Sequence, residues 1–154
     1  MLKVDDPEVR VVIRRSMVAR IATLSIHGRP SINPLYFVSR NNGIWLGTDD
    51  WTLAARNVKA DSRVSVLFEV EKTQGDHRVL RIRGRASISS DFKKLRSYNL
   101  RVAFKYILTP AGILNALAHV RQIPLKLNYN AQGAEKGQPC IIEVAPEQVE
   151  FLKS

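Results

Sequence analysis

Apolar and polar residues alternate along several short stretches of the chain, which is the pattern of half-buried β-strands. In the clearest stretch, residues 78–89, Leu80 and Ile82 face one side whereas Arg81 and Arg83 face the other. The other stretches rich in β-forming residues are 19–26, 30–38, 44–47, 63–70 and 140–144. The pattern therefore predicts six strands.

Tight turns join the first three predicted strands. His27 and Gly28 separate the first from the second, and the run from Asn41 through Asn42 to Gly43 separates the second from the third. Asn and Gly tolerate the positive φ angles that a tight hairpin needs. These three strands should therefore form an antiparallel meander.

In other parts of the chain, the apolar residues recur at the spacing of an α-helix. Residues 7–17 predict a short helix, with Asp6 as its N-cap and Pro7 at its first position. Residues 91–120 also have a helical pattern, which is interrupted near Pro110. A final loop is expected before the last strand.

A compact helix is predicted between the third and fourth strands, over residues 50–60. Trp51, Ala54, Ala55 and Val58 follow the spacing i, i+3, i+4 and i+7, which predicts one buried stripe. Together, the elements predict a mostly β chain with some α. We expect one domain over residues 1–154, a six-stranded antiparallel, Greek-key-like split β-barrel with a helical insertion at about 91–125. Closure of such a barrel leaves few exposed strand edges.

The chain is basic, with 24 Lys and Arg residues against 14 Asp and Glu residues and a net charge of +10. Such an excess suits nucleic acid, an anionic membrane surface or phosphorylated small molecules, although a solvated basic surface explains it equally well. Only residues 78–85 and 93–105 concentrate the charge.

Several classes of protein receive no support from the sequence. Cys140 is the only cysteine, so an internal disulfide is excluded and a cytoplasmic location is expected. No apolar run reaches the roughly 18 residues of a membrane span. His27, His77 and His119 lack metal-ligand spacing, and no phosphate loop or nucleophile elbow is present.

Four ordered blocks of sequence resemble a known family. They are residues 19–24 with 27–30; residues 33–37; residues 47–48, 56–58 and 61–64; and residues 81–86. In this order they resemble the pyridoxamine-phosphate-oxidase-like, FMN-binding split-barrel superfamily. The resemblance implies a homodimer with cofactor sites at the interface, and it implies FMN, the deazaflavin F420 or, less often, haem.

The segment from Gly47 to Asn57 is the candidate phosphate cradle. Backbone amides at the start of the helix favour an anion, and Thr48 and Thr52 offer hydroxyl groups. Arg56 offers a two-pronged donor for phosphate oxygens. The alternative is that Thr48 caps the helix and Arg56 is solvated.

The second candidate region is the ring slot, which would accept the flat part of the cofactor. Pro34 lacks an N–H, so its strand should be an edge, a bulge or a segment that meets a ligand. Asn33 can both donate to and accept from a heterocycle, and Ile32 and Leu35 flank these two residues. An ordinary edge strand is the alternative.

The cradle departs from the family at one position. The family often has a phosphate-binding lysine three residues before the asparagine, and this chain has Ala54 there. Asp49 and Asp50 also place negative charge near the cradle. Arg56 or Lys59 could replace the lysine.

The leading hypothesis is a flavin-dependent oxidoreductase that uses FMN and acts on a small molecule. Such a protein needs no acid or base of its own, so no catalytic residue is named. F420 is the alternative, because Arg81, Arg83, Arg85 and the basic helix could form a groove for its anionic tail. A non-catalytic cofactor- or haem-binding barrel is a second alternative, and nucleic-acid binding through residues 93–105 is a remote third.

Overall fold

The computed structural model describes residues 1–70, 77–106 and 137–153. Its helices are α1 (Pro7–Arg15), α2 (Leu53–Ala60) and α3 (Phe92–Tyr106). Its strands are β1 (Ala19–Leu24), β2 (Pro30–Leu35), β3 (Phe37–Arg40), β4 (Gly43–Asp49), β5 (Arg63–Glu69), β6 (Val79–Ser89) and β7 (Pro139–Leu152). The prediction of a helix at residues 107–125 lies outside the described residues.

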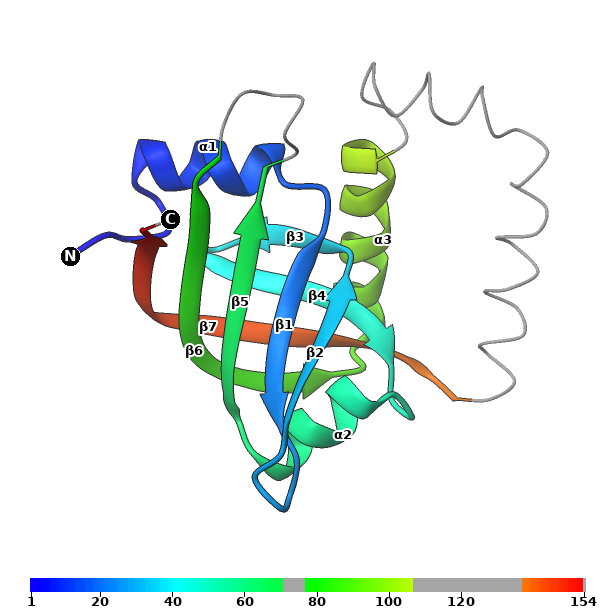
Figure 1. Ribbon diagram of the computed structural model, residues 1–154. Helices are drawn as coiled ribbons and strands as arrows, with labels where there is room; N and C mark the ends of the chain where they lie inside the picture. The colour runs from blue at the N-terminus through cyan, green and yellow to red at the C-terminus, as the bar shows by residue number, and fades with distance from the viewer. Residues whose placement is uncertain (71–76, 107–136, 154) are drawn as a thin grey trace, which may run out of the picture.

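The strands form one antiparallel sheet in the order β2-β1-β5-β6-β7-β4-β3. Its two outermost strands, β2 and β3, are consecutive in the chain and only Tyr36 separates them. The sheet must therefore curl until its edges approach each other, as Figure 1 shows. The predicted split barrel is confirmed.

The barrel has seven described strands rather than the six that the sequence predicts. The expected strand over residues 30–38 divides at Tyr36, because β2 pairs with β1 whereas β3 pairs with β4. A continuous run of apolar residues from Leu35 to Val38 does not reveal such a change of partner. The division places Tyr36 at the seam of the barrel.

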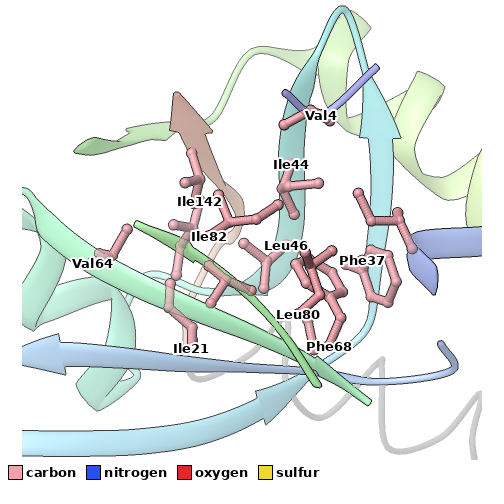
Figure 2. Packing of buried hydrophobic residues seen from close by; sticks show 14 of the residues in the cluster. Val4, Ile21, Phe37, Ile44, Leu46, Val64, Phe68, Leu80, Ile82 and Ile142 are labelled. Carbon is pink, nitrogen blue, oxygen red and sulfur yellow. The ribbon is translucent and has the colours of Figure 1, made fainter. Parts of the chain in front are cut away.

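The interior of the curled sheet is filled by aliphatic and aromatic side chains (Figure 2). Phe37 of β3 meets Phe68 of β5 edge to face, with ring centroids 4.9 Å apart. Ile21, Leu46 and Leu80 are fully buried beside them. Each such side chain stabilises the fold by about 1.5–3 kcal/mol relative to exposure.

The last strand is longer than predicted. The sequence predicts a strand at residues 140–144 and a tail after Pro146, but β7 continues to Leu152 and pairs with β6 from Ile141 onward, except at Glu147. The register shifts between Arg83 and Gly84, which leaves Glu147 as an extra residue. A Cβ at Gly84 would collide with the backbone of Ala145, so this bulge requires glycine.

Helix α2 begins later than predicted, at Leu53, with Thr52 as its N-cap. Ala54, Ala55 and Val58 are buried as expected. Trp51 was expected in the same stripe, but it precedes the helix and is 48% exposed. The sequence pattern extended the helix by three residues because Trp51 happens to fit its period.

Candidate functional site

The turn from β4 into α2 brings the two candidate threonines together. Their hydroxyl oxygens lie 2.9 Å apart. The Thr52 hydroxyl donates to the Asp49 carbonyl at 2.9 Å and accepts from the Ala55 N–H at 3.3 Å. Thr52, and not Thr48, is therefore the helix cap. Since the proton of Thr52 is already used, Thr48 is the donor between the two hydroxyls.

Three donors remain at this end of α2. The N–H groups of Leu53 and Ala54 lie in the first turn and have no carbonyl within the helix to bond. The Arg56 side chain is exposed and forms no ion pair with any residue of the described chain. The cradle therefore consists of two backbone amides and one guanidinium, and Thr48 would join them only by turning its hydroxyl away from Thr52.

The side chain of Asn57 points into the protein rather than towards the cradle. It is only 4% exposed, and its amide nitrogen donates to the Thr23 hydroxyl of β1 at 3.0 Å. Thr23 is buried too. This bond ties α2 to the barrel wall. Asn57 thus positions the helix that carries Arg56.

The residues of the ring slot lie on β2, which bonds to β1 alone among the described strands. Ile32 is 62% exposed and Pro34 is also exposed, whereas Asn33 and Leu35 are half-buried. The Asn33 side-chain carbonyl accepts from the Ser31 hydroxyl at 3.3 Å. β2 contacts both β4 and α2, so the fold brings the slot and the cradle together.

Gly47 has a role that sequence reasoning missed. Tyr98 of α3 lies directly over it, and a Cβ at Gly47 would overlap the phenol ring. The Tyr98 hydroxyl donates to the Tyr36 carbonyl at 3.1 Å, and the Gly47 N–H donates to the same carbonyl at 3.3 Å. Burial raises the pKa of Tyr98 to about 12. Tyr98 therefore closes the seam of the barrel on the side away from β2.

Two carboxylates lie beside the cradle. Burial raises the pKa of Asp49, and the charge of Asp50 raises it further. Asp50 accepts from the backbone N–H of Gln138 at 3.1 Å. A bound phosphate would meet this negative charge, so Arg56 would have to offset it as well as bind the phosphate.

The arginine row of β6 is not a free basic groove. Arg81 and Arg83 lie 2.6 and 3.8 Å from the Glu150 carboxylate of β7, and Arg85 lies 3.5 Å from that of Glu147. The long final strand, which the sequence pattern cut short, supplies both glutamates. Two glutamates therefore offset most of the charge of the three arginines.

Two basic residues of α3 contact other parts of the chain. Lys94 pairs with Glu143 at 2.8 Å, whereas the Lys105 ammonium lies 3.4 Å from the centre of the Phe37 ring. Burial lowers the pKa of Lys105 to about 7. Tyr106 is also fixed, since its hydroxyl donates to the Phe37 carbonyl at 3.3 Å. Within the described chain, Lys94, Lys105 and Tyr106 therefore have partners already and are not free to contact nucleic acid.

The described ranges contain neither a metal-binding cluster nor a helix that could span a membrane. Residues 1–70, 77–106 and 137–153 contain no cluster of three His, Cys, Asp or Glu side chains that could hold a metal ion. In the same part of the chain, no helix has both the length and the apolar character to cross a membrane.

The curled sheet, the short helix after β4 and the seam at Tyr36 define a split-barrel protein. The family model of pyridoxamine 5'-phosphate oxidase matches residues 5–153, and the chain belongs to that family. No curated protein matches the sequence significantly.

Solved structures of the same fold include proteins with different functions. The conserved hypothetical protein Rv2991 from Mycobacterium tuberculosis has a TM-score of 0.70 and 20% identity over 97% of this chain and 84% of that one. An F420 reductase has a TM-score of 0.63 and 20% identity over 92% and 94%. The heme storage protein HutZ from Vibrio cholerae has a TM-score of 0.60 and 17% identity over 98% and 94%. At these identities the likeness supports the fold alone.

Proposed function

We propose that this protein is a flavin-dependent oxidoreductase that binds FMN between β2 and the start of α2. The observation that carries the proposal is that Arg56, an exposed residue without an ion pair in the described chain, lies on α2, and α2 contacts β2. Arg56 and the amides of Leu53 and Ala54 suit a phosphate. Ile32 and Pro34 suit a flat ring.

The residues present fit FMN in part. Two amides, one guanidinium and one hydroxyl form an adequate donor set, but Ala54, at the family's lysine position, is 2% exposed and packs in the core. Bound FMN would supply the hydride or electron chemistry, and the chain would bind and orient it. In this proposal Asn57 holds the helix in place.

The proposal includes a homodimer in which a second copy completes the site. Four large apolar residues are at least 45% exposed: Ile32 of β2, Tyr36 between β2 and β3, Trp51 in the turn before α2, and Leu53 at the first position of α2. A partner subunit or a ring system would remove them from water. Ile32→Glu should shift the mass measured by light scattering from dimer to monomer and weaken FMN binding. An unchanged mass would contradict this interface.

A direct test compares FMN with riboflavin, which lacks the phosphate, by fluorescence titration. FMN should bind at least about tenfold more tightly, since charge-assisted bonds to phosphate contribute roughly 1.5–3 kcal/mol each. Arg56→Gln should abolish this difference. The matched control is Lys59→Gln, an exposed residue one turn further along α2, which should preserve it. Equal losses in both variants would contradict the assignment of Arg56.

F420 is the second candidate, and the fold of an F420 reductase favours it. The glutamate-paired arginines of β6 no longer offer its tail a free groove, so FMN remains first. Titration with F420 and with haem separates these cofactors by their absorption spectra. The single cysteine, Cys140, is the reason that the proposal places the protein in a reducing cytoplasm.

A further inference from the structure

A cavity of about 1110 Å³ lies between α1, the turn from β3 to β4, and α3. Helix α1 lies at the opposite end of the barrel from α2 (Figure 1). None of the cradle or ring-slot residues lines this cavity. It is therefore separate from the site proposed for FMN within one subunit.

The described walls of the cavity carry four arginines, one lysine and no carboxylate. Arg10, Arg14 and Arg15 come from α1, and Arg101 and Lys105 come from α3. The four arginines have no ion pair within the described chain, in contrast to Arg81, Arg83 and Arg85 of β6. Several like charges around one concave space raise the local concentration of anions. The electrostatics of the cavity thus select a ligand with more than one negative charge.

The remaining walls are largely apolar. Ile13, Met17 and Val38 line the cavity, together with Leu100 and Phe104 of α3. Leu100 and Phe104 are more than half exposed, which is unfavourable unless something covers them. Inorganic phosphate would occupy a small part of about 1110 Å³ and would leave these apolar walls in water. The ligand should therefore have an apolar body as well as charge.

We propose that this cavity binds an organic anion that combines an apolar body with at least two negative charges, of the class of aryl or acyl phosphates. The guanidinium groups of Arg14 and Arg101, from facing helices, would bind the charged group, and Leu100 and Phe104 would cover the apolar body. The inference does not depend on FMN binding. A concave pocket with mixed walls suits a small molecule better than a nucleic-acid duplex.

The test uses isothermal titration of the full chain with 1-naphthyl phosphate as the probe. Inorganic phosphate and 1-naphthol represent its two halves. The probe should bind at least about tenfold more tightly than either half, because only the whole molecule meets both kinds of wall. Equal binding of inorganic phosphate or of 1-naphthol would overturn the proposal.

Variants locate the binding. Arg14→Gln with Arg101→Gln should weaken probe binding at least about tenfold, since two charge-assisted contacts are lost. The matched control removes the same two charges at exposed positions outside the cavity, through Arg29→Gln and Arg96→Gln. Leu100→Glu, at an exposed position that should not disturb folding, should also abolish binding. Circular dichroism verifies that each variant is folded.

Competition experiments exclude two other occupants. Saturating FMN should leave the affinity for the probe unchanged, and competition between them would overturn the proposal by assigning the cavity to the cofactor. A short DNA duplex should bind weakly and should not distinguish the cavity variants from the control. Duplex binding that only the cavity variants lose would assign the surface to nucleic acid instead.

Discussion

The phenol ring of Tyr98 occupies the space that a Cβ would need at Gly47. Its hydroxyl reaches past Gly47 to the carbonyl of Tyr36, where β2 ends and β3 begins. One glycine therefore lets α3 pack against the seam of the barrel. The relationship explains why α3 lies on β3 and β7 rather than standing away from the sheet.

Gly47→Ala should destabilise the protein by about 3 kcal/mol, because the methyl group must displace Tyr98. Tyr98→Phe keeps the ring and should cost only about 1 kcal/mol, the value of one hydrogen bond. Urea denaturation measures both free energies of unfolding. In a Tyr98→Ala background the methyl group has room, so the cost of Gly47→Ala should nearly vanish. A cost that persists there would mean that Tyr98 is not the obstacle.

The bond between Asn57 and Thr23 gives a second prediction. Both side chains are buried, so Asn57→Ala leaves the Thr23 hydroxyl without its partner and should cost about 1–3 kcal/mol. Thr23→Val should cost a similar amount. The double variant should cost clearly less than the sum, because the second change removes a group that is already unpaired. Additive costs would show that the bond contributes little.

Most of the barrel could be predicted from the sequence because its strands alternate cleanly and its turns carry Gly and Asn. The pattern could not reveal that Tyr36 divides one stretch into two strands, because apolar residues continue through it from Leu35 to Val38 and the two strands differ in partner. The sequence predicts that the last strand ends at residue 144, before Pro146, but a bulge opposite Gly84 lets β7 continue. Partner choice and bulges are tertiary features that local spacing does not encode.

The sequence was enough to group the candidate anion donors, but it did not show which residues of other elements pack around them. Thr48, Thr52 and Arg56 lie on one short segment, so local reasoning could group them. Tyr98 is 51 residues from Gly47 along the chain, so local sequence does not show that they touch. The glycine at position 47 is the one signal that another group packs closely there. Trp51 fitted the helical period by chance, and no local signal opposed that assignment.

Cys140 should react slowly with thiol reagents in the native protein. It is 1% exposed, and burial, followed by the charge of Asp50, raises its pKa to about 11. At pH 8 only about one thiol in a thousand would be the reactive thiolate. The rate of labelling by Ellman's reagent should rise at least about a hundredfold in 8 M urea. Equally fast labelling of native and unfolded protein would contradict the burial of this thiol.

Lys105 should make stability depend on pH above neutrality. Burial lowers its pKa from 10.5 to about 7, so between pH 7 and 10 the unfolded chain holds a proton that the folded chain has lost. Stability should therefore rise with pH over this window, by at most about 1.4 kcal/mol per pH unit. The nearby ring of Phe37 attracts the ammonium group of Lys105 and should reduce this slope. The positive charges of Arg14, Arg15 and Arg101, which line the same cavity as Lys105, favour loss of its proton.

Lys105→Met removes the titrating group and keeps its apolar stem. The variant should be more stable than the parent at pH 7, and its free energy of unfolding should change less between pH 7 and 9. Lys93→Met, at an exposed position of the same helix, should follow the parent curve. Burial raises the pKa of Tyr98 and of Tyr106. Near pH 10 the unfolded chain loses the protons of these phenols and the folded chain keeps them, so stability then falls with pH. The measurement therefore stops at pH 9. Parallel curves for Lys105→Met and the parent would show that Lys105 titrates alike in the folded and unfolded chains.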